Sequence, residues 1–291
     1  MTGGPLFDLD ARLLLFVEFQ DFFGEVASRC HARTLVKANI LATAQSSPVP
    51  VGRIAMCYYG GMRRLLLTLA VVLLAAPASA DDFDAGQAAA DRGDLAAAFR
   101  IWKPLAERGH AAAQYALGAC YLHGAGVKQN HRKAFEWYSK SAARGFVGAA
   151  SALGYFYKNG LGGVGRDYEK AALWYRKDAE RGLSDAQATL GFLYYRGYGM
   201  PRDYSAALLW FEKAAEQGDA KAQHNLGVMH TEGQGTQKDY VSAMMWLTLS
   251  AMQGYDKAMA NRETLARQMS ANEVARAQDM ADDWLAEHRA R

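Results

Sequence analysis

The feature that most restricts the fold is a Leu-Gly pair that returns along the chain at nearly constant spacing. The four leucines stand 36, 37 and 36 residues apart: Leu117, Leu153, Leu190 and Leu226. A tryptophan keeps the same period, with a glycine eight residues after each one: Trp137, Trp174, Trp210 and Trp246. Self-similarity with a period of about 20–50 residues arises when one supersecondary unit is stacked in series. The sequence therefore predicts an array of repeats rather than a globule built around one pocket.

Each repeat is predicted to contain two helices. Around the leucine, alanine stands four residues earlier, an apolar residue three later, tyrosine or histidine four later and glycine seven later, which describes one helical face ending at a turn. The second helix starts at a residue suited to accept a backbone N–H at the N-cap. These caps are Asn130, Asp167, Asp203 and Asp239. Alanine four residues after the cap and tryptophan seven after it are interpreted as core.

The spacing also sets the expected domain boundaries. Four repeats are predicted, at 110–145, 146–182, 183–218 and 219–254. A degenerate repeat over 81–109 precedes them as an N-terminal cap, and capping helices follow over 255–291. In this last segment Ser270 and Glu273 form the sequence pattern of a capping box, which predicts the start of a final helix.

The repeat motif resembles the Sel1-like repeat family, a subgroup of tetratricopeptide-like proteins. Its pattern, A-x-x-x-L-G-x-x-Y-x-x-G-x-G followed by D-Y-x-x-A-x-x-W-Y-x-x-A-A-x-x-G, is nearly complete over Ala186–Gly218. Departures are small: Asn130-His131 replaces Asp-Tyr, and His230 replaces tyrosine. The resemblance implies an all-α fold, a right-handed α/α solenoid whose concave surface binds other proteins, and a role as a scaffold or adaptor.

Composition and motifs argue against most other classes of function. The net charge of +3, from evenly mixed charges, does not indicate nucleic-acid binding. The histidines show no H-x-x-x-H or H-E-x-x-H spacing, so no metal, cofactor or catalytic residue is predicted. The alternative is a β-lactamase-like hydrolase of the cysteine-rich branch of the resembled family, which carries a cysteine pair in each repeat. Only Cys120 lies in this array, and it is interpreted as a small buried residue.

A partner surface is expected where the repeats differ from one another. Positions two before, two after and five after the leucine vary freely and form one stripe of the first helix. Because the resembled family lines its concave side with first helices, we expect a protein or peptide partner to contact five of these residues: Tyr155, Lys158, Phe192, Tyr195 and His224. The competing interpretation is that they are solvent-facing residues without a binding role.

Residues Met62–Ala80 have the three regions of a secretory signal peptide. Met62-Arg63-Arg64 is basic, Leu65–Ala76 is an apolar run of 12 residues, and an Ala-x-Ala ending precedes Asp81. Cleavage after Ala80 would give a periplasmic or secreted protein with no membrane segment in the mature form; the alternative is a single membrane anchor. We expect residues 1–61 to be a misassigned N-terminal extension, the alternative being a genuine cytoplasmic segment.

Overall fold

The computed structural model describes residues 80–289, and the regular structure in this range is α-helical throughout. The predicted extension, the predicted signal peptide up to Ser79, Cys30 and Cys57 lie outside the described residues. The helices are α3 (Ala80–Asp91), α4 (Leu95–Glu107), α5 (Ala111–His123), α6 (His131–Ala143), α7 (Ala149–Asn159), α8 (Tyr168–Ala179), α9 (Ser184–Arg196), α10 (Tyr204–Ala215), α11 (Ala220–Glu232), α12 (Tyr240–Met252), α13 (Asp256–Ala266) and α14 (Ala271–Arg289).

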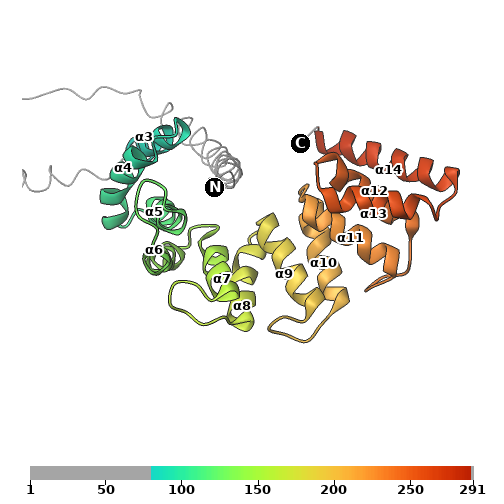
Figure 1. Cartoon of the computed structure of the whole chain (residues 1–291), viewed down its shortest axis with the longest axis horizontal. Coiled ribbons are helices and arrows are strands. Elements are labelled where there is room, and N and C mark those ends of the chain that lie inside the picture. The colour runs from blue at the N-terminus through green and yellow to red at the C-terminus, as the bar shows by residue number, and fades with distance from the viewer. Residues whose placement is uncertain (1–79, 290–291) are drawn as a thin grey trace, which may run out of the picture. The chain divides into compact units, whose positions relative to one another are not determined.

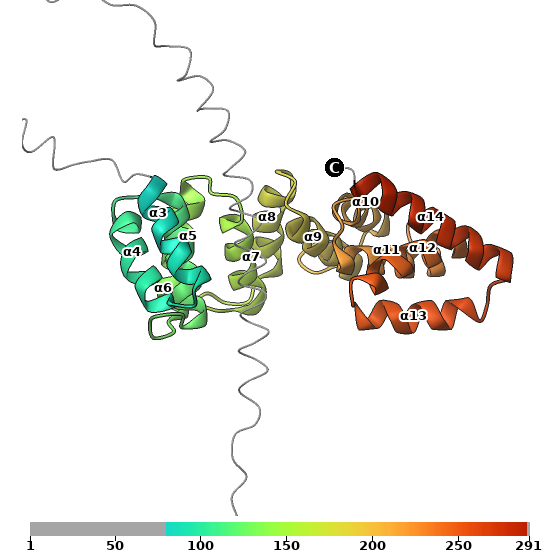
Figure 2. The same cartoon turned by 90° about the horizontal axis from the view of Figure 1, so that it is seen from above.

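The helices form hairpins that follow one another in a bent row (Figure 1). Helices α5 and α6, α7 and α8, α9 and α10, and α11 and α12 are the four repeats, and α3 and α4 form a related pair before them. After the last repeat, α14 lies along α12 while α13 lies at the edge of the unit (Figure 2). This arrangement confirms the predicted all-α solenoid.

The second helices start at the predicted N-caps because each cap side chain accepts a backbone N–H of the first turn. Asp203 Oδ1 accepts the N–H of Ala206 at 2.9 Å. The side-chain oxygens of Asn130, Asp167 and Asp239 accept the equivalent backbone N–H groups at 3.0, 2.9 and 3.1 Å. The predicted capping box is also present, since Ser270 and Glu273 exchange hydrogen bonds before α14.

The predicted face of each first helix forms the core, and the Leu-Gly glycine explains how closely the two helices pack. The four leucines, the alanines before them and the residues three positions after them are buried. A Cβ placed on Gly191 would lie 2.9 Å from the Phe211 ring, so only glycine leaves room for that ring. Tyr138, Tyr175 and Leu247 cover the corresponding glycines of the other repeats.

The interpretation of the repeat tryptophans as core is wrong for three of the four. Trp137, Trp174 and Trp210 are only partly buried, and a lysine three residues later lies over each ring. These lysines are Lys140, Lys177 and Lys213, with ring distances of 4.1, 3.9 and 4.3 Å. The buried residue is the one that follows each tryptophan. Its side chain faces the Leu-Gly glycine, and it is Tyr138, Tyr175, Phe211 or Leu247. Trp246 alone is buried, against Trp284 of α14.

Stacking of successive repeats depends on the second glycine of each Gly-x-Gly turn. Gly199 has φ +75°, and a Cβ there would collide with the backbone of Tyr168 and Glu169 at the start of α8. Gly126, Gly162 and Gly235 face the first residues of α4, α6 and α10 in the same way. The turn of each repeat therefore rests directly on the backbone of the preceding second helix.

One helix is capped by a side chain from a neighbouring helix. Helix α7 follows Gly148, which has no side chain to accept the free N–H groups. The buried Asp178 of α8 supplies the acceptor: its Oδ2 receives the N–H groups of Gly148 and Ser151 at 3.1 and 2.7 Å and the Ser151 hydroxyl at 2.9 Å. No periodic pattern in the sequence indicates this contact.

Candidate interaction surface on the first helices

Two of the five residues proposed to contact a partner are large and exposed. Tyr155 of α7 and Phe192 of α9 occupy the same repeat position, two residues after the leucine, and each is 41% exposed. The equivalent residues are Ala119, which is buried, and Val228, which is partly buried. The exposed aromatic pair therefore belongs to the two central repeats.

Lys158 lies beside this pair. Its Nζ is 5.9 Å from the ring centroids of both Tyr155 and Tyr175. Burial lowers the pKa of Lys158, and the positive charge of Lys221 lowers it further. Lys158 forms no ion pair with a carboxylate in the described part of the chain. It thus adds an uncompensated cation next to an exposed aromatic ring.

Tyr195 is engaged with the core of its repeat. Its ring centroid lies 5.4 Å from that of Tyr204, and it packs against the buried cluster that contains Phe211 and Leu226. Burial raises the pKa of Tyr195, and Glu232 contributes in the same direction. Truncating Tyr195 would consequently disturb packing as well as any surface contact.

His224 contacts the segment that follows its repeat. Its ring makes an edge contact with Tyr255 at 5.2 Å, and its Nε2 is 3.0 Å from Nδ2 of Asn261. Burial lowers the pKa of His224, and Lys257 lowers it further. Tyr115 contacts Phe146 at the equivalent place, with tilted rings whose centroids are 5.2 Å apart. An aromatic residue directly after the terminating glycine was the sequence signal for this contact between repeats.

The residues suggested by the alternative enzymatic class do not assemble into a site. Cys120 is fully buried, and this burial raises its pKa to about 12, so the thiol stays protonated near neutral pH. Among residues 80–289 there is no cluster of three or more His, Cys, Asp or Glu side chains able to hold a metal ion. None of the helices in this range is both long and apolar enough to cross a membrane.

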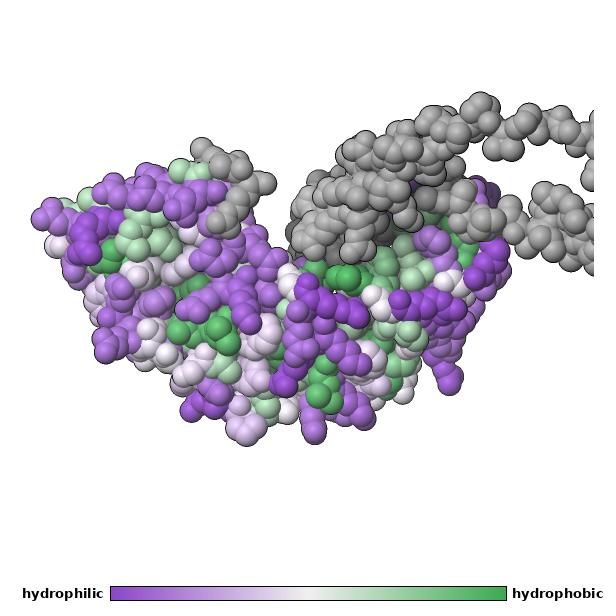
Figure 3. All heavy atoms as spheres, turned by 180° about the vertical axis from the view of Figure 1, so that it is seen from behind, coloured by the Kyte–Doolittle hydropathy of each residue, from purple (hydrophilic) through white to green (hydrophobic). Residues whose placement is uncertain are grey.

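The face seen from behind mixes hydrophobic and hydrophilic residues. Hydrophobic side chains lie there in separate small patches among hydrophilic ones (Figure 3). Recognition on such a surface would depend on individual side chains rather than on one broad apolar area.

Tandem helical hairpins, each with a Gly-x-Gly turn between its two helices, define a helical repeat protein of the α/α solenoid class. The Sel1 repeat family model matches residues 111–146, 147–183, 184–219 and 220–255. A Sel1 repeat protein from Oxalobacter formigenes has a similar structure, with a TM-score of 0.56 and 31% identity, over 61% of this chain and 73% of that one. The chain belongs to the Sel1 repeat family. Proteins of this family are generally scaffolds for protein interactions.

This chain also matches parts of two longer proteins. A protective antigen of uropathogenic Escherichia coli strains, which displays an SLR fold, aligns with a TM-score of 0.65 and 32% identity, over 70% of this chain and 45% of the antigen. An exopolysaccharide production negative regulator of Rhizobium leguminosarum bv. viciae is 33% identical over 93 residues, which are 28% of this chain and 35% of the regulator. This chain therefore covers less than half of either protein.

Proposed function

We propose that this protein is a non-enzymatic scaffold that holds a protein or peptide segment against its first helices. The observation that carries the proposal is the pair of exposed aromatic side chains, Tyr155 and Phe192, at one repeat position of adjacent hairpins. Aromatic rings give a large contact area at a small cost in side-chain entropy, which suits them as anchors of an interface. In Figure 1, α5 and α7 lie on the inner side of the bend, where a bound segment would touch several repeats.

The remaining predicted residues take different parts in this proposal. Lys158 would contact the partner beside Tyr155, while Tyr195 and His224 would hold the shape of the surface through their contacts with Tyr204 and Tyr255. The relationship to a regulator fits a protein that acts by binding another protein, and it supports no particular pathway.

Capture of a partner from cell extract by the full chain tests the proposal. The double variant Tyr155→Ala/Phe192→Ala should keep its helicity and melting temperature and lose the captured protein, because both rings are exposed. Leu209→Ala/Met252→Ala is the matched control, since these second-helix residues are 50% and 56% exposed. Retention of the partner by the first variant, or its loss only in the control, would contradict the proposal.

The enzymatic alternative has its own direct test. A non-enzymatic scaffold should not hydrolyse nitrocefin, a chromogenic β-lactam. Turnover by the purified protein that disappears on Cys120→Ser would contradict the scaffold proposal, because it would show that the buried thiol reacts.

We also propose that the protein is exported, through a signal peptide at Met62–Ala80 with cleavage after Ala80. The support is the order of basic, apolar and small-residue regions in the sequence. N-terminal sequencing of the cellular protein should find Asp81 as the first residue of a periplasmic or secreted product. Recovery of a chain that starts at Met1 would contradict export by this route.

A further inference from the structure

One junction between repeats lacks a buried hydrogen bond that other junctions have. Three first helices carry a buried glutamine three residues before the Leu-Gly leucine, and its Nε2 donates to a carbonyl oxygen near the end of the preceding helix. The pairs are Gln114 with Ala106, Gln187 with Ala179 and Gln223 with Ala215, at 3.0, 3.0 and 3.2 Å. Helix α7 has Ala150 at this position. Within residues 80–289 the corresponding carbonyl oxygen, that of Ala142, therefore has no side-chain donor.

Two other positions at the same junction carry short side chains. In α6 the residues nine and thirteen positions after the N-cap are Ser139 and Ala143. The equivalent residues of α4, α8 and α10 are long and charged: Lys103 and Glu107, Arg176 and Glu180, and Glu212 and Glu216. Those of α12 are Thr248 and Met252. Ser139, Ala143 and Ala150 all line one cavity of about 510 Å³ between α6 and α8. The three short side chains at this junction thus leave one shared space between the helices.

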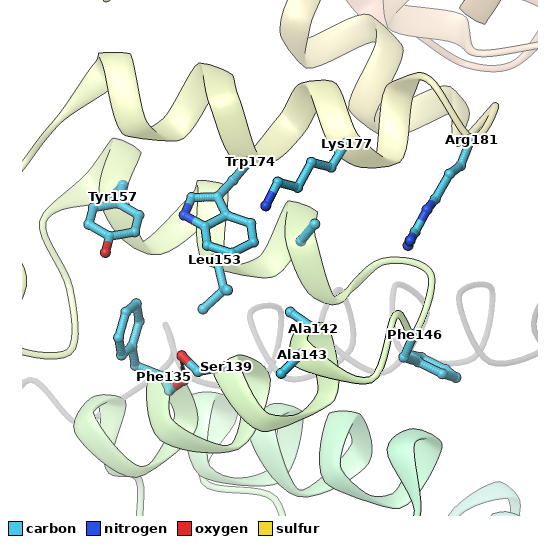
Figure 4. A pocket seen from close by; sticks show the side chains of 11 residues that line it. Phe135, Ser139, Ala142, Ala143, Phe146, Leu153, Tyr157, Trp174, Lys177 and Arg181 are labelled. Carbon is cyan, nitrogen blue, oxygen red and sulfur yellow. Dashed lines mark hydrogen bonds between the residues drawn. The ribbon is translucent and has the colours of Figure 1, made fainter.

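The walls of this cavity are largely aromatic and aliphatic. Trp174 projects from α8 into the space between the helices, Leu153 of α7 lies behind it, and Phe135 and Tyr157 lie at one end (Figure 4). The Phe135 and Tyr157 rings meet edge to face at 5.8 Å, which fixes that end of the cavity. Its size falls in the range of about 300–1,000 Å³ that is typical of ligand pockets.

The charges at the rim are unbalanced. Lys177 lies over the Trp174 ring at 3.9 Å and makes no ion pair with a carboxylate of the described residues. Arg181, which also lines the cavity, donates to the Gly145 carbonyl oxygen at 3.2 Å and lies 3.7 Å from Asp178. Helices α4, α8 and α10 carry glutamate where α6 has Ala143, and α12 carries Met252, so this rim has a cation without the acid found beside three of the other helices.

We propose that this junction cavity binds a peptide segment of a partner protein that carries an apolar side chain next to a carboxylate. The apolar side chain would fill the space against Trp174 and Leu153, and the carboxylate would pair with Lys177. An amide N–H of the segment would donate to the Ala142 carbonyl oxygen, as glutamine does at other junctions. The cavity is lined by α6, α7 and α8, and none of its lining residues is among the five of the proposed first-helix surface, so the two sites are separate.

The test uses two small peptides as probes of the full chain, acetyl-Leu-Glu-amide and its neutral counterpart acetyl-Leu-Gln-amide. Titration at millimolar concentration should shift the Trp174 indole N–H signal in the ¹H–¹⁵N spectrum, assigned with Trp174→Phe. The acidic peptide should bind about fivefold more tightly, the scale of a solvent-exposed ion pair. Ala150→Gln should abolish the shift, because the new side chain fills the cavity and reaches the Ala142 carbonyl oxygen.

Lysine variants at two equivalent positions supply a matched control. Lys177→Gln should reduce binding of the acidic peptide to the level of the neutral one. Lys213→Gln, which changes the equivalent exposed lysine over Trp210, should leave both affinities unchanged. A Trp174 signal that moves with neither peptide, moves equally with both, or still moves in Ala150→Gln would overturn the proposal. None of these readouts depends on the first-helix surface.

Discussion

At the scale of single residues, the least replaceable side chain is Asp178. Its carboxylate is fully buried on α8 yet accepts the free N–H groups at the start of α7, so it joins two helices of one repeat. Asp178→Ala should lower the free energy of unfolding by about 3 kcal/mol, because several donors lose their acceptor. Ser151→Ala removes only the hydroxyl bond and should cost about 1 kcal/mol. Chemical denaturation measures the free energy of unfolding of both variants. Equal losses in the two would contradict the capping role of Asp178.

Three histidines make stability depend on pH. Burial lowers the pKa values of His110, His224 and His230 below 6.5, so the unfolded chain binds protons more tightly than the folded one. Stability should therefore be highest above about pH 6.5 and fall as the pH drops toward the folded-state values. His110 adds a direct reason, since its Nδ1 accepts the Ala113 N–H at 3.2 Å and cannot do so when protonated.

Melting temperatures measured between about pH 7.5 and pH 5.5 test this dependence on histidine titration. The chain should melt at a lower temperature at the acidic end, and His230→Tyr, which restores the residue of the other repeats, should reduce the difference. Glu212 and Asp219, whose pKa values burial raises, act in the opposite direction, because their folded state binds protons more tightly than the unfolded chain. A melting temperature that rises toward pH 5.5 would contradict the assignment.

At the scale of elements, the second glycine of each turn controls how one hairpin rests on the next. Gly199 and Gly182 both have positive φ, but only at Gly199 would a Cβ meet backbone atoms. Gly182→Ala should cost about 1 kcal/mol from the left-handed backbone alone. Gly199→Ala should cost about 3 kcal/mol, since the turn must also move away from α8. Similar losses for the two variants would show that the turn does not support stacking.

At the scale of the whole molecule, the local features could be predicted from sequence and the contacts between helices could not. N-caps, glycine-terminated helices and the buried leucine face follow from spacing within about 15 residues. The Asp178 cap joins residues about 30 apart, and no periodic pattern indicates it. The contact of His224 with Tyr255 is equally distant in sequence, and its only signal is the aromatic residue after the terminating glycine, which two of the four repeats carry. The prediction that the repeat tryptophans are core was wrong for a similar reason. Helical phase alone does not distinguish a buried ring from its half-buried neighbour.

The cavity at Ala150 shows that differences between the repeats also indicate where their packing differs. Differences between repeats occur outside the variable stripe of the first helix as well. The loss of glutamine at Ala150 and of long side chains at Ser139 and Ala143 is visible in the sequence, but their convergence on one space requires the packing of both α6 and α8 against α7. Departures from a repeat pattern thus become interpretable once the neighbours of each position are known.

Site-specific photo-crosslinking most directly tests the claim that the first helices carry the partner surface. The photoreactive residue p-benzoylphenylalanine is placed at position 192 or, as a control of similar exposure, at position 209. Irradiation of cells that make each full-length variant should give a covalent adduct with a partner protein from position 192 and none from position 209. Adducts only from position 209, or equal adducts from both, would contradict the account.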